Sequence, residues 1–388
     1  MPPFGSDFVH IEATGGLILL VAVITAMVWA NASPAGYISW WNHHLTLGLG
    51  DASITNDARH WVNDGLMAVF FFVVGLEVKR ELVVGELRDR RTAALPVVAA
   101  LGGMAVPALL FAACNLGGAG ARGWAIPMAT DIAFVVGVMA LLGDRVPRGV
   151  KLFVLSLAIV DDIGAVVVIA VFYAGGVHAA WLAGAAVTLL VVLLMARRGV
   201  ERPVLYLVPA MVLWVCTFHA GVEATLAGLA VGLAIPARSE SGFARLQRLE
   251  DRSHLGSTFL VVPVFALANA GLLVDRAAAS RALASPIALG IGLGLVVGKL
   301  VGISTATWFG VRAGLGRLPA DVGRREVAGL AALAGMGFTV SLFVADLAFS
   351  GHALADAKLG IFGASLVAAG LGAAILTWAA RRRRELIP

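Results

Sequence analysis

The sequence predicts an all-α polytopic membrane protein with about twelve transmembrane helices. Of its 388 residues, 60% are hydrophobic and 14% are charged, whereas about a quarter are charged in a typical soluble domain. The mean hydropathy is +0.91. This composition excludes a water-soluble enzyme, a disordered chain and a nucleic-acid-binding protein, despite a net charge of +5. The two cysteines, Cys114 and Cys216, lie singly in apolar runs, so no disulfide framework or zinc site is predicted.

A helix that spans a bilayer needs about 20 apolar residues. Apolar runs near this length recur along the chain. The basic residues test this division, because Lys and Arg concentrate in cytoplasmic loops. With the N-terminus inside, nearly all of them fall in inner loops, so we expect both termini to be cytoplasmic and the first run to be a retained span. The exceptions are Arg59, Arg122, Arg276, Arg281 and Lys358 in outer loops and Lys299 within a span. The predicted spans are 14–31, 60–78, 95–115, 124–143, 151–174, 179–196, 204–219, 221–236, 255–274, 286–310, 326–349 and 357–380.

Two segments are poorly suited to continuous helices. Residues 126–131 place Pro127 and Asp131 in mid-span, and residues 334–339 contain a Gly-Met-Gly sequence. Each is the middle member of a three-span group, spans 3–5 and spans 10–12. Paired broken helices in corresponding places indicate inverted repeats whose two discontinuous helices cross at the membrane midplane. Ordinary tolerance of Pro and Gly in membrane helices is the competing interpretation. In the tenth span, glycines 290, 294, 298 and 302 form a stripe suited to close helix packing.

Asp161 and Asp162 are the most informative polar feature, because these adjacent carboxylates lie deep in an apolar span. A charge at that depth costs about 2.5–3.5 kcal/mol on insertion scales, so it is retained for a partner or a use. The two side chains lie about 100° apart around a helix and address different neighbours. A carboxylate binds a proton or a hard cation, and this competition is sufficient for exchange. An ion pair with Lys299 beside a capped acid is the structural alternative.

Thr130 and Asp131 lie in the first broken span, where exposed helix ends need compensating charge. We expect Asp131 to neutralise helix N-termini and Lys299 to neutralise C-termini, although Lys299 could also carry a proton. Two charged clusters lie at the inner ends of other spans. They are either solvated ion-pair groups or a funnel that attracts cations and senses protons. One contains Glu77, Lys79, Arg80 and Glu81, and the other contains Glu250, Asp251, Arg252 and His254.

Four motifs carry a family resemblance that runs nearly end to end. They are FFFVVGLEVKREL at 70–82, WAIPMATDIAF at 124–134, AIVDDIGA at 158–165 and GMGFT at 335–339. These motifs resemble those of the bacterial NhaA-type sodium/proton antiporters. That family is one of the transporters from which the inverted-repeat rule is drawn, so the two arguments are not independent. The resemblance implies interface domains at 1–94 and 179–285, and core repeats at 95–178 and 286–388.

The resemblance also implies a function. It is electrogenic export of sodium or lithium in exchange for a larger number of protons by alternating access, for pH and sodium homeostasis. The protein would be a homodimer in the lipid bilayer of the bacterial inner membrane. Na+, Li+ and H+ would be its partners, without cofactor or nucleic acid, and it would be a transporter and not an enzyme.

Residue roles follow from the motif match. Asp162 would be the main carboxylate for the cation and the proton, and Asp161 would join it in binding the transported Na+ and would pair with Lys299. Three other residues would lie at the crossing of the broken helices, namely Thr130, Asp131 and Gly337. The candidates for pH regulation are Glu77, Arg80, Glu81, Glu250 and His254.

The sequence departs from the family pattern at Glu223 and Asp251, where well-known members have histidine. Histidine titrates near neutrality and Glu ordinarily does not, so we expect a shifted pH profile. Two alternative functions stay open on the sequence alone. A sodium-coupled symporter of similar fold would need a polar pocket for an organic solute, whereas the core has few amides, Asn269 being one. An intramembrane diaspartyl protease would carry its two acids on separate helices.

Overall fold

Helices make up almost all of the regular structure. The structure, a computed structural model, describes residues 6–47, 53–176, 178–237 and 240–385. Within these residues seven helices are long and apolar enough to cross a membrane, or nine if each of two bent helix pairs is one span. The predicted all-α polytopic membrane class is therefore confirmed. The seven are α1 (Ser6–Ala32), α5 (Arg90–Cys114), α7 (Arg148–Phe172), α8 (Ala179–Arg197), the segment Pro203–Ala220 that contains α9, the segment Pro286–Arg312 and α18 (Gly351–Glu385).

Besides the two spans formed by bent helix pairs, three of the twelve predicted spans lack a long, continuous apolar helix in the described part of the chain. α4 (Met67–Val83) ends in a charged sequence, α10 (Leu226–Ala234) has nine residues, and α12 (Val262–Asn269) has eight. α12 follows the charged helix α11 (Glu240–Gly256) and a π-helical turn. Because a bilayer core needs about 20 residues, these segments cross only together with flanking turns, and the number twelve stays a prediction.

The chain divides into two compact units. Unit 1 comprises Met1–Ile18, Glu86–Ala165 and Val274–Pro388, and unit 2 comprises Leu19–Gly85 and Val166–Leu273. Apart from α5 and α18, the elements of unit 1 that lie after residue 85 and wholly inside it are η3 (Glu86–Arg88), η4 (Ala119–Met128), α6 (Ile132–Leu142), η5 (Gly143–Arg145), α13 (Arg276–Ala284), α14 (Pro286–Leu293), η8 (Gly294–Gly298), α15 (Lys299–Arg312), α16 (Arg324–Leu333) and α17 (Phe338–Ala348).

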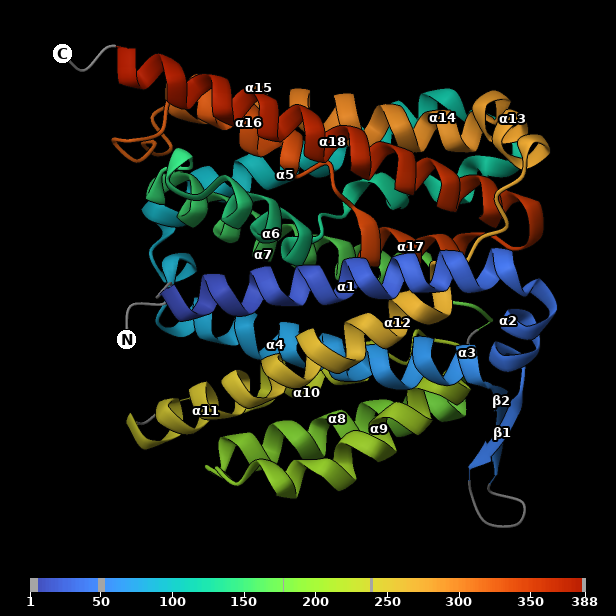
Figure 1. The fold of residues 1–388 in the computed structure, drawn as a ribbon. Helices are drawn as coiled ribbons and strands as arrows, with labels where there is room; N and C mark the ends of the chain where they lie inside the picture. Colours follow the sequence, from blue (N-terminus) through green and yellow to red (C-terminus); the bar gives the residue numbers. More distant parts are fainter. Residues whose placement is uncertain (1–5, 48–52, 177, 238–239, 386–388) are drawn as a thin grey trace. The chain divides into compact units, whose positions relative to one another are not determined.

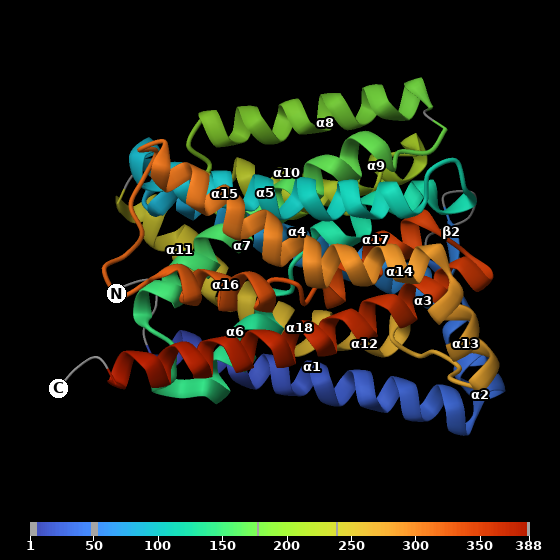
Figure 2. The same ribbon diagram turned by 90° about the horizontal axis from the view of Figure 1, so that it is seen from above.

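In unit 1, α15 lies along α5 because glycines leave no side chains between their backbones (Figure 2). A Cβ atom on Gly298 would lie 2.8 Å from the Cα of Pro107, and one on Gly302 would lie 2.9 Å from the carbonyl carbon of Gly102. Any larger side chain would therefore push the helices apart. The glycine stripe predicted from the sequence is confirmed as a packing surface. It brings Lys299, at the start of α15, against the interior of unit 1, where its side chain is fully buried.

Unit 2 contains a two-stranded antiparallel sheet, which is absent from the elements expected from the sequence (Figure 1). His44 lies opposite Asp57 and Leu47 opposite Ile54 in this hairpin. The sequence carries little signal for it, because His44–Leu47 alternates polar and apolar residues but Ile54–Asp57 does not. The elements of unit 2 are α2 (Pro34–Trp41), β1 (His44–Leu47), β2 (Ile54–Asp57), α3 (Ala58–His60), η2 (Trp61–Leu66), α4, α8, η6 (Pro203–Tyr206), α9 (Leu207–Ala220), α10, α11, η7 (Ser257–Val261) and α12.

Two helix pairs organise unit 2. α8 and α9 lie side by side (Figure 1), and α4 packs on α10 through facing glycines. A Cβ on Gly75 would lie 3.1 Å from the Cα of Gly232, so the close contact of the two backbones depends on glycine. Nearby, the buried amides of Asn63 and Asn269 hydrogen-bond each other, with a distance of 2.7 Å from Asn269 Nδ2 to Asn63 Oδ1. Asn269, one of the few amides that the sequence places in the core, is therefore paired with another side chain.

Candidate functional site

Two interrupted helices meet inside unit 1. η4 ends at Met128 and α6 begins at Ile132, with a bend of 42° between the two segments. α16 and α17 are separated at residues 334–337, with a bend of 47°. Pro127, which lacks a backbone N–H, and the glycines on either side of Met336 weaken helix continuity at these points. The backbone N–H of Asp131 donates to the carbonyl oxygen of Met336 at 2.6 Å, so the two interruptions touch.

The buried carboxylate of Asp131 caps both helices that begin at the interruptions. Its Oδ1 accepts a hydrogen bond from the backbone N–H of Phe134 in α6, at 3.2 Å. Its Oδ2 accepts from the backbone N–H of Thr339 in α17 at 3.0 Å and from the Thr339 hydroxyl at 2.7 Å. Helix N-termini carry partial positive charge and unpaired N–H groups. One negative side chain therefore satisfies two helix ends, which is the compensating arrangement expected for Asp131.

Lys299 supplies the opposite charge at the same crossing. Its ammonium group donates to the carbonyl oxygen of Met128 at the end of η4, and to Thr130 Oγ1 at 3.0 Å. It also forms an ion pair with Asp161 Oδ2 at 2.6 Å, and both side chains are fully buried. The Thr130 hydroxyl donates to the same Asp161 oxygen at 2.6 Å. A buried ion pair is stable only when further hydrogen bonds satisfy its groups, and here the broken helix provides them.

The second oxygen of Asp161 is the exceptional atom of this cluster. Oδ1 is buried and has no hydrogen-bond partner among the residues that the structure describes. An unsatisfied buried acceptor ordinarily costs about 1–3 kcal/mol, and more for a charged group, so it marks a place for an ion or water. The adjacent Asp162 is also buried, and its charge acts on Lys299. The charges of two neighbouring carboxylates therefore act on one cation, and one oxygen of Asp161 is open to another ligand.

Gly337 lies in the second interruption, against the backbone of the first. A Cβ at this position would lie 2.9 Å from Leu295 Cδ2 and 3.0 Å from the carbonyl oxygen of Ala129, and it would also collide with the Ser341 hydroxyl. That hydroxyl is engaged, since it donates to the carbonyl oxygen of Ile126 at 2.8 Å. The crossing thus requires a residue without a side chain.

Gly337→Ala is expected to destabilise the protein by about 1–3 kcal/mol, because the added methyl group forces the two broken helices apart. The measurement is the melting temperature of the purified protein in detergent. The matched control is Gly137→Ala in α6, where a Cβ meets nothing within 4 Å. Equal melting temperatures for the two variants would show that the crossing tolerates a side chain.

A second charged cluster lies in unit 2 and joins the two surface clusters found in the sequence. Arg80 forms ion pairs with Glu250 at 2.5 Å and with Glu81 at 3.1 Å. Both carboxylates are buried, and the first pair links α4 to α11. Burial opposes the charge of Arg80, but the carboxylates of Glu250, Glu77 and Glu81 raise its pKa. The cluster thus contains two ion pairs whose carboxylates are buried.

Glu250 is poised to titrate near neutrality. Burial raises the pKa of Glu250 to about 7, although Arg80 lowers it, while Glu77 and Asp251 raise it and His254 lowers it. The His254 ring nitrogen Nε2 lies 3.4 Å from the Thr258 hydroxyl. A buried carboxyl group with a shifted pKa inside an ion-pair network is a candidate functional group.

Comparison with known proteins identifies the family. Residues 6–376 match the protein family described as Na+/H+ antiporter 1. The chain belongs to this family. It is 45% identical to the Na(+)/H(+) antiporter NhaA 2 of Erythrobacter litoralis, over 97% of this chain and 94% of the relative. It is 44% identical to the Na(+)/H(+) antiporter NhaA of Pectobacterium carotovorum subsp. carotovorum over 94% and 93%, and 42% identical to that of Oleidesulfovibrio alaskensis over 97% and 94%.

Membership in the Na+/H+ antiporter 1 family decides between the functional classes. Its named members are transporters and not enzymes, so the intramembrane protease is disfavoured, and so is the symporter. The resemblance read from the four motifs is confirmed. The helical, multi-pass architecture described above agrees with a protein of the inner membrane.

The structure groups the sequence-predicted residues of this antiporter family member into two places. Unit 1 brings together Thr130, Asp131, Asp161, Lys299 and Gly337, with Asp162 adjacent, and unit 2 brings together Glu77, Arg80, Glu81, Glu250 and His254.

Sequence reasoning missed several contributors to the first site. They are the hydroxyl groups of Thr339 and Ser341 and the backbone carbonyls of Met128 and Ala334; the last lies 3.0 Å from Thr130 Oγ1. Thr339 and Ser341, two hydroxyl residues separated by one position in an apolar segment, could have been recognised in the sequence as candidate polar contacts. The carbonyls could not, because every residue has one.

Proposed function

We propose that this protein exports Na+, and also Li+, in exchange for a larger number of H+. The observation that carries the proposal is the buried pair Asp161 and Asp162 at the contact of two broken helices, with Asp161 Oδ1 open to a ligand. Hard cations prefer oxygen ligands, and a carboxylate cannot hold a proton and a metal ion on the same site. Binding of one ligand therefore expels the other. No cofactor is needed, because the ions themselves are the substrates.

Asp162 is assigned as the main carboxylate for both ions. A Na+ ion that enters beside it displaces its proton and competes with Lys299 for the carboxylate of Asp161. Because Lys299 loses its counter-charge in that state, it too can release a proton. More than one proton then leaves for each cation that binds. The cycle moves net charge, so inward proton flow and the membrane potential both drive sodium export.

The architecture proposed for this cycle has about twelve spans and two inverted three-helix repeats. The repeats are residues 95–178 and 286–388, and they use alternating access around a site at the midplane. In support, each broken pair lies between two longer helices, η4 and α6 between α5 and α7, and α16 and α17 between α15 and α18. Residues 1–94 and 179–285 are proposed as an interface domain that forms a homodimer in the lipid bilayer. Both termini are proposed to face the cytoplasm.

Reconstitution into proteoliposomes with a preset pH gradient tests this function. Added Na+ or Li+ should dissipate the gradient, and added K+ should not. An imposed membrane potential should change the rate, because the exchange moves charge. Dissipation by K+ alone, or a rate insensitive to potential, would contradict the proposal.

The cluster of Glu77, Arg80, Glu81, Glu250 and His254 is proposed to regulate transport by pH, serving sodium and pH homeostasis. Below about pH 7 the carboxyl group of Glu250 holds a proton, and above it the ionised group attracts Arg80 of α4, although the cost of burying its charge is the larger effect. Glu223 and Asp251 replace family histidines. Asp251 is exposed, and its charge raises the pKa of Glu250. Of the two replacements, it is therefore the one proposed to act directly on the titration of Glu250.

Glu250→Gln tests this regulation. The pKa of Glu250 rises from 4.5 to about 7 on folding. Its contribution to stability is therefore full below the unfolded pKa and is lost as the pH rises through about 7. The decline in melting temperature over this range, worth up to about 3 kcal/mol, should flatten in the variant. The pH profile of transport should shift as well. Glu201→Gln, which removes an acid from the more exposed pair with Arg245, should leave both profiles unchanged.

A further inference from the structure

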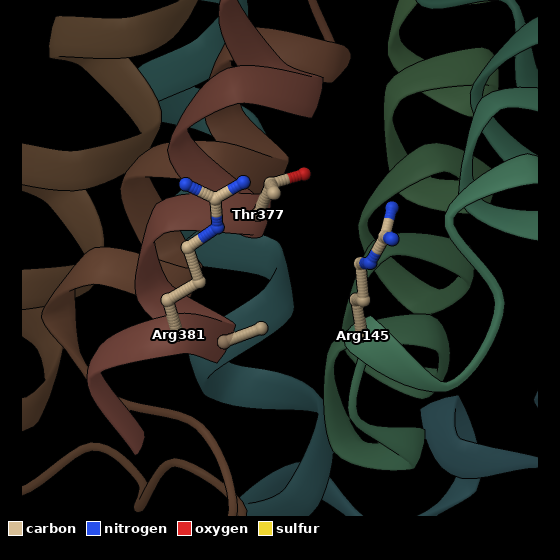
Figure 3. A pocket seen from close by; sticks show the side chains of 4 residues that line it. Arg145, Thr377 and Arg381 are labelled. Atoms are coloured by element: carbon tan, nitrogen blue, oxygen red, sulfur yellow. The ribbon is translucent and has the colours of Figure 1, made fainter. Parts of the chain in front are cut away.

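A basic hollow in unit 1 lies apart from both sites described above. It is lined by Arg145 of η5 and by Thr377, Ala380 and Arg381 of α18. Figure 3 shows the two arginine side chains on opposite sides of the hollow, with the Thr377 hydroxyl directed into it. The space measures about 170 Å³, an order of magnitude more than the ~10–15 Å³ that one water requires. It has room for a hydrated anionic group.

The charges around the hollow are unbalanced. Neither Arg145 nor Arg381 has an ion-pair or hydrogen-bond partner within the part of the chain that the structure describes. Arg383, in the same helix as Arg381, differs from them, since it binds the carboxylate of Glu326 at 2.6 Å. Two guanidinium groups that face one space repel each other unless an anion lies between them. Guanidinium groups bind phosphate oxygens with matched geometry, and a hydroxyl adds a further donor.

The surroundings of the hollow identify the source of the anion. Leu141, one turn before Arg145, is 88% exposed, and Trp378, beside Thr377, is 48% exposed. An exposed leucine, an exposed tryptophan and arginines are typical of the level where a membrane's apolar core meets its headgroups. The guanidinium group of Arg325 lies over the Trp378 ring, 4.6 Å from its centroid. A soluble anion would make no contact with these exposed apolar side chains, whereas the acyl chains of a lipid would pack against them.

We propose that this hollow binds the phosphate group of an anionic phospholipid, with Arg145, Arg381 and Thr377 as its ligands. In the proposed topology both arginines face the cytoplasmic leaflet, where an anionic headgroup can reach them. The bound lipid would tie η5, at the end of the first broken helix, to the last helix of the chain. The proposal does not rest on ion exchange, because binding is measured without transport.

Native mass spectrometry of the purified protein tests this proposal, with phosphatidylglycerol and phosphatidylcholine of identical acyl chains as probes. The wild type should prefer phosphatidylglycerol. A basic side chain near anionic lipid is worth about fivefold in affinity, so the double variant Arg145→Gln/Arg381→Gln should lose roughly thirtyfold. The control Arg88→Gln/Arg317→Gln removes the same charge from exposed positions of unit 1 and should keep the preference.

Two further measurements distinguish a bound lipid from a soluble anion and test the ligand set with both arginines kept. Millimolar inorganic phosphate should fail to displace phosphatidylglycerol from the wild type. Displacement would assign the hollow to soluble anions and overturn the lipid proposal, as would wild-type binding by the arginine double variant. Should that variant fold poorly, Thr377→Val keeps both charges and should still weaken phosphatidylglycerol binding severalfold, and unchanged binding would count against the proposed ligand set.

Discussion

Asp162→Asn is expected to abolish sodium-driven proton movement in proteoliposomes. Asparagine has nearly the shape of aspartate, but it can neither carry a negative charge nor exchange a proton with Na+. Removing one partner of a buried charged contact costs about 2–5 kcal/mol, so the transport rate at a fixed Na+ concentration should fall about a hundredfold or more. Because the side chain is buried in α7 and keeps its volume, the fold should survive.

The matched control for this prediction is Asp144→Asn. It removes an acid from the same unit at an exposed position in η5, outside the proposed binding site. Its transport should equal that of the wild type. Full activity of the Asp162 variant, in protein that elutes and melts like the wild type, would refute the assignment of Asp162 as the exchanging carboxylate.

Lys299→Met is expected to give the largest loss of stability. The variant leaves the carboxylate of Asp161 buried without its cation and the carbonyl of Met128 without its donor. Breaking a buried ion pair by removing one partner costs about 3–5 kcal/mol. The melting temperature in detergent should therefore fall clearly. The comparison variant is Arg281→Met, whose partly exposed pair with Asp356 is worth no more than about 1 kcal/mol.

A double variant separates charge from shape in the same experiment. Asp161→Asn/Lys299→Met removes both charges, so no buried ion is left alone, and most of the lost stability should return. Both the double variant and the single Lys299 variant should lose transport. If the single variant melts like the wild type, the pair does not stabilise the crossing, and Lys299 acts elsewhere in the cycle.

The candidate site was predictable to an unusual extent, because its chemistry is costly in a membrane. Asp161, Asp162 and Lys299 are visible in the sequence as charges inside apolar runs, where retention requires a reason. Pro127 and the glycines near Met336 mark the breaks for an equally local reason, since they disfavour helix. The hydrogen-bond partners supplied by the main chain were invisible, because any residue could have supplied them.

Other features needed the fold. The hairpin of β1 and β2 lies in a region that hydropathy treats only as a loop, because four-residue strands carry too little periodic signal. The link between Arg80 and Glu250 spans 170 positions, and only the packing of α11 on α4 makes it. From the sequence alone, the cluster around Arg80 and the cluster around Glu250 are two separate groups of surface charges.

The sequence by itself determined the membrane class, the two helix breaks and the presence of paired acids with one buried cation. These follow from local composition, because water and hydrocarbon act on each segment separately. Residue types alone left open which aspartate would pair with Lys299, although the family resemblance named Asp161. The tertiary structure decided it: the pair joins residues 138 positions apart. Which carboxylate faces the lysine depends on the rotation of α7 relative to α15, and the close packing of neighbouring helices sets that rotation.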